Sequence, residues 1–138
     1  MKILVATDGS QASDKAVDVA VARARQSGAQ LVIANVAEAF CPVGVTELDP
    51  TVFEEASRKE SAAILAAALA RAKSAGIEPL AVHETGSPAD TLIAIAKREG
   101  VAEIFIASHG RHGLARLAMG SVSTRVVEWA PCTVTVVK

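Results

Sequence analysis

The stretch "KILVATDGSQASDKAVDVAVARARQSGAQLVIANV", Lys2 to Val36, contains the repeating unit that decides the fold. Its two ends, Lys2–Ala6 and Gln30–Val36, are nearly continuous apolar runs, as expected of strands that are covered on both faces. The segment between them stops at Gly28 and has one apolar helical face, formed by Ala12, Ala16, Val19, Ala20 and Ala24. A strand, a helix and a second strand in this order predict a parallel pair with a right-handed crossover.

The rest of the chain repeats this alternation. Further strands are predicted at Pro79–Glu84, Glu103–Ala107 and Thr133–Val137. A long helix is predicted from Thr51 to Ala75, and its apolar stripe consists of Leu65, Ala68, Leu69 and Ala72. The order β-α-β-α-β-α-β-α-β predicts an α/β fold with a doubly wound parallel sheet, in a single domain over residues 1–138.

Two shorter helices have recognisable ends. In "SPAD", Ser87 can cap a helix, Pro88 suits its first position, and Asp90 completes a capping box. The apolar side of this helix includes Leu92, Ile95 and Ala96. The last helix should begin near Gly120–Ser121, carry Val122, Val126 and Trp129, and end before Pro131.

The composition excludes several classes of function. The 138 residues have a net charge of −1, which argues against a general nucleic-acid-binding surface. Aromatic residues make up only 3%, too few for platforms on which nucleobases stack. No stretch is apolar for long enough to span a bilayer, and Met1 leads directly into the first strand, so no signal peptide is expected. Two distant cysteines, Cys41 and Cys132, fit a reducing compartment, and we expect a cytoplasmic protein.

Two loops carry the candidate chemistry. Ligands of open α/β sheets bind at the carboxyl ends of strands, and "TDGS" (Thr7–Ser10) and "SHGRHG" (Ser108–Gly113) follow the first and fourth strands. If these strands are neighbours, both loops face one crevice. Asp8 could accept hydrogen bonds from a ribose or a base amine on one side of that crevice.

The other side of the crevice suits an anion. The last helix presents N–H groups at Gly120, Ser121 and Val122, and Ser121 and Ser123 add hydroxyl donors. Positive charge comes from the same acid-free segment, in Arg111, Arg116 and Arg125. The competing interpretation is that the glycines and serines are ordinary helix caps and that the arginines form a solvated face. The residues alone leave both interpretations open.

Several established motifs are absent. The sequence has no GxxxxGK[ST] loop, and no GxGxxG follows the first strand. His109 and His112 have no neighbouring carboxylate or cysteine, so no metal site is predicted. His83 is interpreted as structural. No catalytic residue can be assigned.

The chain resembles the universal stress protein family over essentially its whole length. The resemblance is carried by "ILVATDGS", by Asn35–Val36, by "TGSPADTLIAIAK", by "SHGRHGLARLAMGSVS" and by "APCTVTVVK". ATP-binding members of this family carry a G-x2-G-x9-G-[ST] signature after the fourth strand. Gly110, Gly120 and Ser121 satisfy its longer part, whereas Ala107 replaces its first glycine, and the extra methyl group could crowd a ligand.

The resemblance implies a flavodoxin-like (adenine nucleotide alpha hydrolase-like) sheet with strand order 3-2-1-4-5. It also implies that Asp8 contacts the adenosine, that Val36 lines the adenine pocket, and that the glycines hold the phosphates. The candidate nucleotide-binding residues are Ala6, Thr7, Asp8, Val36, Ile106, Ala107, Gly110, Arg111, Gly113, Gly120, Ser121, Val122 and Ser123. A divalent Mg or Mn ion would be bound through the phosphates of ATP.

The family further implies a homodimer, formed by antiparallel pairing of the last strands through Thr133, Val134, Thr135, Val136 and Val137. An exposed β-branched edge strand favours such a partner for physical reasons too. The leading hypothesis is therefore a dimeric, ATP-binding stress-response protein that uses the nucleotide as a ligand or switch. Activity beyond the slow ATP hydrolysis or self-phosphorylation of some relatives is not expected.

Two alternatives remain open from the sequence. A nucleotide-free protein-interaction module of the same family is favoured by Ala107. An adenylyl-transferring enzyme of related architecture is the weaker alternative, because its histidine-rich signature would follow the first strand, whereas "SHGRHG" follows the fourth.

Overall fold

The computed structural model describes residues 1–38, 49–110 and 119–138. Strands and helices alternate as β1 (Lys2–Ala6), α1 (Gln11–Ser27), β2 (Gln30–Ala37), α2 (Pro50–Ser74), β3 (Leu80–Thr85), α3 (Pro88–Glu99), β4 (Glu103–Ala107), α4 (Ser121–Trp129) and β5 (Thr133–Val137). The predicted element order is confirmed.

The five strands form one parallel sheet in the order β3-β2-β1-β4-β5, as predicted. β1 is the central strand, and its Val5 lies between Ile33 of β2 and Phe105 of β4. The chain winds outward from β1 through β2 to β3, and then from β4 to β5 on the other side. The strand order therefore reverses between β1 and β4, which is the position where folds of this type form a crevice.

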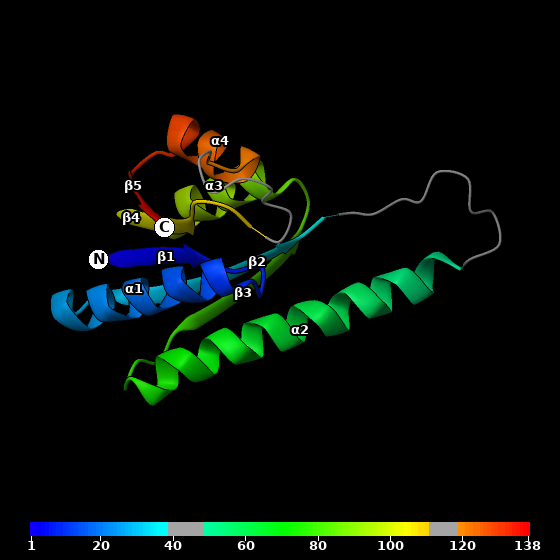
Figure 1. Cartoon of the computed structure of the whole chain (residues 1–138), viewed down its shortest axis with the longest axis horizontal. Helices are drawn as coiled ribbons and strands as arrows, with labels where there is room; N and C mark the ends of the chain where they lie inside the picture. The colour runs from blue at the N-terminus through cyan, green and yellow to red at the C-terminus, as the bar shows by residue number, and fades with distance from the viewer. Residues whose placement is uncertain (39–48, 111–118) are drawn as a thin grey trace.

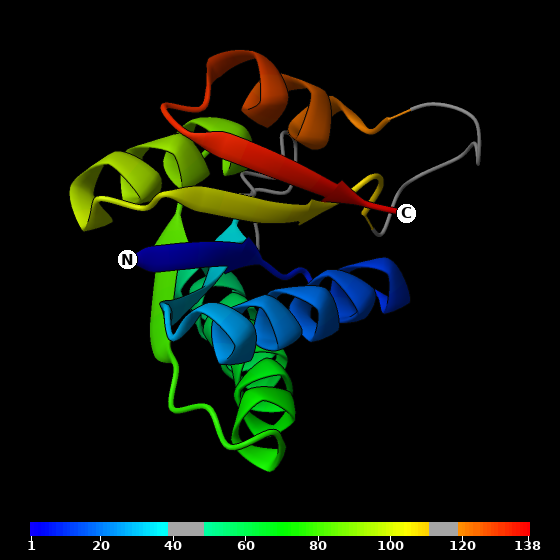
Figure 2. The same ribbon diagram turned by 90° about the vertical axis from the view of Figure 1, so that its left-hand side faces the viewer.

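Helices cover both faces of the sheet. α1 and α2 lie on one face and α3 and α4 on the other (Figure 1), an arrangement that the turned view confirms (Figure 2). Ile3 and Val5 pack into the core on the α1 side, whereas Leu4 packs into the core on the α3 side. All three side chains are fully buried, and each such burial contributes about 1.5–3 kcal/mol. Two covered faces explain why these strands lack an alternating polar pattern.

The helix ends follow local chemistry, with one exception. The Ser10 hydroxyl oxygen accepts a hydrogen bond from the Ser13 N–H at 3.1 Å and caps α1. The capping box predicted for α3 is wrong: Ser87 occupies the N-cap position but makes no side-chain cap bond. Asp90 accepts a hydrogen bond from Arg125 of α4 at 2.8 Å, so its carboxylate ties α3 to α4.

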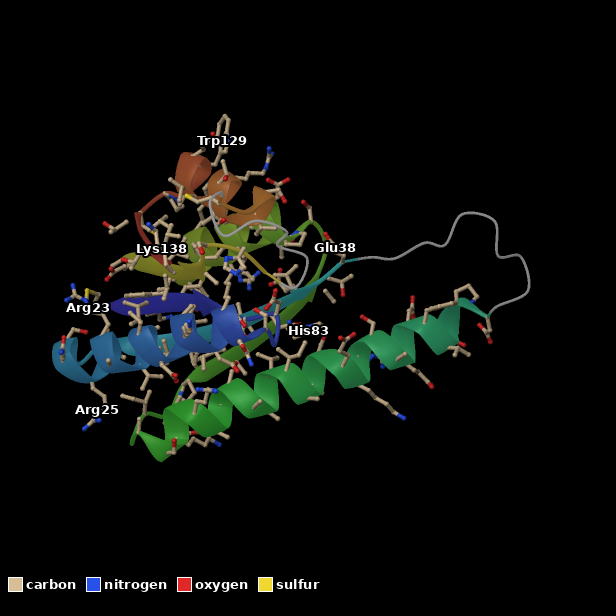
Figure 3. All side chains as sticks on the ribbon, in the orientation of Figure 1. Arg23, Arg25, Glu38, His83, Trp129 and Lys138 are labelled. Carbon is tan, nitrogen blue, oxygen red and sulfur yellow. The ribbon has the colours of Figure 1, made fainter. Side chains whose placement is uncertain are left out.

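Two apolar residues predicted on the inner faces of helices lie on the surface. Val19 is 42% exposed, because Val17 and Val21 lie on the side of α1 that faces the sheet. Trp129 is 65% exposed and projects outward from the end of α4 (Figure 3). Val126 is instead the fully buried apolar side chain of α4.

Candidate functional site

The carboxyl ends of the strands border a cleft of about 1190 Å³. Eleven candidate residues line it: Ala6, Thr7, Asp8, Val36, Ile106, Ala107, Gly110, Gly120, Ser121, Val122 and Ser123. Arg111 and Gly113, like Arg116 and His112, lie outside the described residues. β1 and β4 pair directly, so the prediction that their loops face one crevice is confirmed.

The loop after β1 is a tightly bonded turn. Gly9 has φ 80°, a left-handed conformation that glycine adopts without strain. The Ser10 N–H donates to Asp8 Oδ1 at 2.9 Å, and the Gly9 N–H donates to the Thr7 hydroxyl oxygen at 3.3 Å. The Thr7 hydroxyl also lies 3.2 Å from the hydroxyl of Ser13 on α1. These bonds fix the direction of the Asp8 side chain at the edge of the cleft.

Asn35 holds this turn from the neighbouring strand. Its Nδ2 donates to the Thr7 carbonyl oxygen at 2.9 Å, and the residue is only 4% exposed. Asn35 was not among the candidate residues predicted from the sequence. The available signal was an amide side chain within the otherwise apolar run "LVIANV".

Asp8 and Gly110 meet where the two loops approach. A Cβ atom added to Gly110 would lie 2.5 Å from Asp8 Oδ2. Ordinary van der Waals contact begins at about 3.4 Å, so only a glycine leaves room for the carboxylate in this position. Close packing against Asp8 therefore explains why a glycine occupies position 110.

The start of α4 forms the opposite wall. The Gly120 N–H donates to the Ser108 carbonyl oxygen at 2.6 Å, and the Ser123 hydroxyl is within 3.0 Å of the same oxygen. The expectation that these two groups are free donors is therefore wrong, because both bind the end of β4. The backbone N–H groups of Ser121, Val122 and Ser123 have no acceptor within the helix, and no acidic residue lies in its first turn. Among the described residues, these three N–H groups and the hydroxyl of Ser121 are donors that this wall can offer.

Arg125 does not supply charge to this wall. Its Nε donates to Asp90 at 2.8 Å, and this hydrogen bond raises the pKa of the Arg125 guanidinium. Both side chains are more than half exposed. The expectation that Arg125 is uncompensated is wrong, because Asp90 comes from a helix that is distant in sequence but adjacent in space.

Further side chains line the cleft without having been predicted for it. His83 of β3 is exposed, and it lies on the side of the sheet that α2 covers (Figure 3). Ser57, Ser61 and Ile64 of α2 line the same side. The position of α2 depends on long-range packing, so no local motif marks these residues. His109 also lines the cleft, and its Nδ1 lies 3.1 Å from the Ser108 hydroxyl oxygen.

The described residues contain neither a membrane-spanning helix nor a group of metal ligands. None of their helices is long and apolar enough to cross a membrane. Within the same residues, no three or more His, Cys, Asp or Glu side chains are grouped so that they could hold a metal ion.

Comparison with known proteins identifies the family. The model of the universal stress protein family matches residues 1–138. Universal stress protein YxiE of Bacillus subtilis is 34% identical over 145 residues, which cover 99% of this chain and 98% of YxiE. The structure of universal stress protein UspA from Lactobacillus plantarum aligns with a TM-score of 0.83 and 28% identity, over 100% of this chain and 97% of that one.

A universal stress protein solved in complex with cAMP also aligns, with a TM-score of 0.77 and 28% identity. The alignment covers 100% of this chain and 97% of that protein. With a family match over its whole length and a relative of this similarity, the chain belongs to the universal stress protein family.

Proposed function

We propose that this universal stress protein binds ATP in the cleft and uses the nucleotide as a ligand or switch. One observation carries the proposal: an acceptor, Asp8, packed against Gly110, and a set of backbone donors at the start of α4 line the same cleft. A nucleotide has the complementary layout, because its nucleoside end carries hydrogen-bond donors and its phosphate end is anionic. The relative that was solved with cAMP supports an adenine nucleotide.

The phosphates would lie at the start of α4. The N–H groups of Ser121, Val122 and Ser123 point along the helix axis, and the helix dipole favours negative charge at this end. Ser123 contributes through its backbone, since its hydroxyl binds Ser108. Because the described residues offer no metal cluster, a divalent Mg or Mn ion would be held by the phosphates and water.

The nucleoside would lie between the Asp8 turn and Val36. The Asp8 carboxylate is positioned to accept hydrogen bonds from the ribose or the base, while Ala6 and Ile106 provide apolar contacts along the cleft floor. Ala107 is 7% exposed and packs into the core on the α1 side. This burial supports the view that its methyl group leaves room for a ligand.

We extend the proposal to a homodimer through β5. β5 is an edge strand that pairs with β4 on one side only, and its residues Thr133–Val137 are all β-branched and mostly half-buried. An edge of this kind is completed by pairing with a second strand. The test is light scattering after size-exclusion chromatography, which should give twice the 14.2 kDa of one chain. The mass of a single chain at all concentrations would refute the dimer.

The nucleotide is tested by denaturing freshly purified protein, identifying any released nucleotide by chromatography, and titrating the stripped protein with ATP and Mg²⁺. Gly120→Val should abolish binding without changing the oligomeric mass, because its Cβ would already contact Ser108, His109 and Ser123 at 3.5–3.6 Å, so the branched methyl groups must displace the first turn of α4, which carries the N–H donors. The matched control is Ala94→Val, on an exposed position of α3. Unchanged ATP affinity in Gly120→Val would refute the site. A protein that contains no nucleotide and ignores ATP would favour the interaction module.

A further inference from the structure

Asn35 is a buried polar side chain whose hydrogen bonding is incomplete. Its Nδ2 donates to the Thr7 carbonyl oxygen at 2.9 Å. Its Oδ1 has no partner, and among the described residues it is the only buried side-chain nitrogen or oxygen in this condition. Rotating the amide by half a turn would place Oδ1 against the Thr7 carbonyl oxygen, so the hydrogen bond determines which atom is left unpaired.

The bond to Thr7 explains the Nδ2 of this side chain but not its Oδ1. A single hydrogen bond stabilises a folded protein by less than an unpaired buried acceptor destabilises it. An aliphatic side chain at this position would leave the Thr7 carbonyl oxygen without its donor, so the bond to Thr7 accounts for Nδ2 and leaves Oδ1 unexplained. Buried polar groups are nearly always paired in functional proteins. Asn35 is therefore best explained by a state in which a donor reaches Oδ1.

The cleft is the route by which such a donor can arrive. Asn35 lines the cleft at the end of β2, and the start of α4 follows β4, two strands away. Adjacent strands are spaced by about 4.8 Å, which separates Asn35 from the phosphate end by roughly 10 Å. In a nucleotide, the base is the part that lies farthest from the phosphates.

We propose that Asn35 is a specificity-determining residue that reads the base: its Oδ1 accepts a hydrogen bond from the exocyclic amine of the bound nucleotide. The inference rests on the proposed function and deepens it. It predicts selection of a base that carries an amine at this edge, such as adenine, over hypoxanthine, which carries a carbonyl oxygen there. A carbonyl oxygen would face Oδ1 acceptor to acceptor and would repel it.

The test combines ligand analogues with variants. Calorimetry measures the Kd values of ATP, of inosine triphosphate, and of purine riboside triphosphate, which lacks the amine. The wild type should bind ATP roughly tenfold more tightly than either analogue. In Asn35→Leu this preference should disappear, whereas Thr85→Val, a control at another cleft-lining position, should keep it.

The ratio of affinities is the informative quantity. Asn35→Leu also removes the bond to Thr7, so all three ligands can lose affinity together through the Asp8 turn. A preference for ATP that survives in Asn35→Leu would overturn the inference while leaving the ATP site intact. A wild type that binds none of the three ligands would refute the proposed function itself.

A second measurement covers the case in which Asn35→Leu fails to fold. In wild-type protein labelled with ¹⁵N, the side-chain NH₂ signal of Asn35 should shift on adding ATP and much less on adding purine riboside triphosphate. Equal shifts with both ligands would overturn the inference. The inference would also be overturned if the Asn35 Oδ1 accepts a hydrogen bond from His83, the residue opposite Asn35 on β3. Oδ1 would then need no donor from the nucleotide, and the preference for ATP would be independent of Asn35.

Discussion

Replacing Gly110 with alanine tests the contact on which the proposed site depends. The new Cβ would lie 2.5 Å from Asp8 Oδ2, about 0.9 Å closer than the 3.4 Å at which ordinary contact begins. Gly110 is not among the glycines with positive φ, so its backbone accepts alanine without torsional strain. The overlap must therefore be relieved by a movement of the Asp8 carboxylate, which is the end of a flexible side chain.

We expect Gly110→Ala to lower nucleotide affinity far more than stability. Moving Asp8 sacrifices a hydrogen bond to a charged group, worth about 1.5–3 kcal/mol, which corresponds to a roughly 10- to 150-fold weaker Kd for ATP. Calorimetric titration with ATP measures the affinity, and thermal denaturation measures the stability. An unchanged Kd would show that Asp8 does not contact the nucleotide, and would refute the assignment of the nucleoside end.

Gly100→Ala is a control for which the opposite effects on stability and affinity are expected. Gly100 ends α3 with φ 64°, and no atom lies within 4 Å of the position of an added Cβ. Alanine there would be strained by about 1–2 kcal/mol in the left-handed conformation without touching anything. The control should therefore lose stability and keep its ATP affinity, the reverse of the pattern expected for Gly110→Ala.

Three further predictions concern stability, charge and reactivity. Val126→Ala should lower the free energy of unfolding by about 2 kcal/mol in a urea titration, since Val126 is fully buried. Arg125→Ala should leave the Kd for ATP within about twofold of the wild-type value, because the guanidinium binds Asp90 in an exposed pair. A larger loss of affinity would show that Arg125 contributes to the nucleotide site. Burial, with a smaller contribution from Glu103, raises the pKa of the Cys132 thiol. Less thiolate is then present at neutral pH, so in a Cys41→Ser background alkylation followed by mass spectrometry should be slower than for a free cysteine.

The fold was predictable because its determinants are local and repeated. Apolar strands such as Lys2–Ala6 require cover on both faces, and each of the first four is followed by a helix with recognisable ends. Alternation then leaves few topologies, and parallel pairing follows from the crossovers. The inner face of a helix was harder to predict: Val19 and Trp129 are apolar, but the direction in which a helix faces the sheet depends on tertiary packing.

The location of the site was predictable from the sequence, but the hydrogen bonds of its residues were less predictable. The loops after β1 and β4 line one cleft, which topology alone implies. The partners of individual groups were not predictable, because they come from residues distant in sequence. Arg125 binds Asp90, the Gly120 N–H binds Ser108, and Asn35 reaches back to Thr7. Each of these bonds crosses between elements that no local pattern connects.

Ser108 connects the two features that the proposed function needs. Its N–H donates to the carbonyl oxygen of Val137 at 2.9 Å, which holds the end of the edge strand β5. Its carbonyl oxygen accepts from the Gly120 N–H and lies within 3.0 Å of the Ser123 hydroxyl, which fixes the start of α4. One residue therefore links the proposed dimer edge to the proposed phosphate wall. The proposed phosphate wall and the proposed dimer edge share Ser108 as a hydrogen-bonding partner, although they are formed by different elements, α4 and β5.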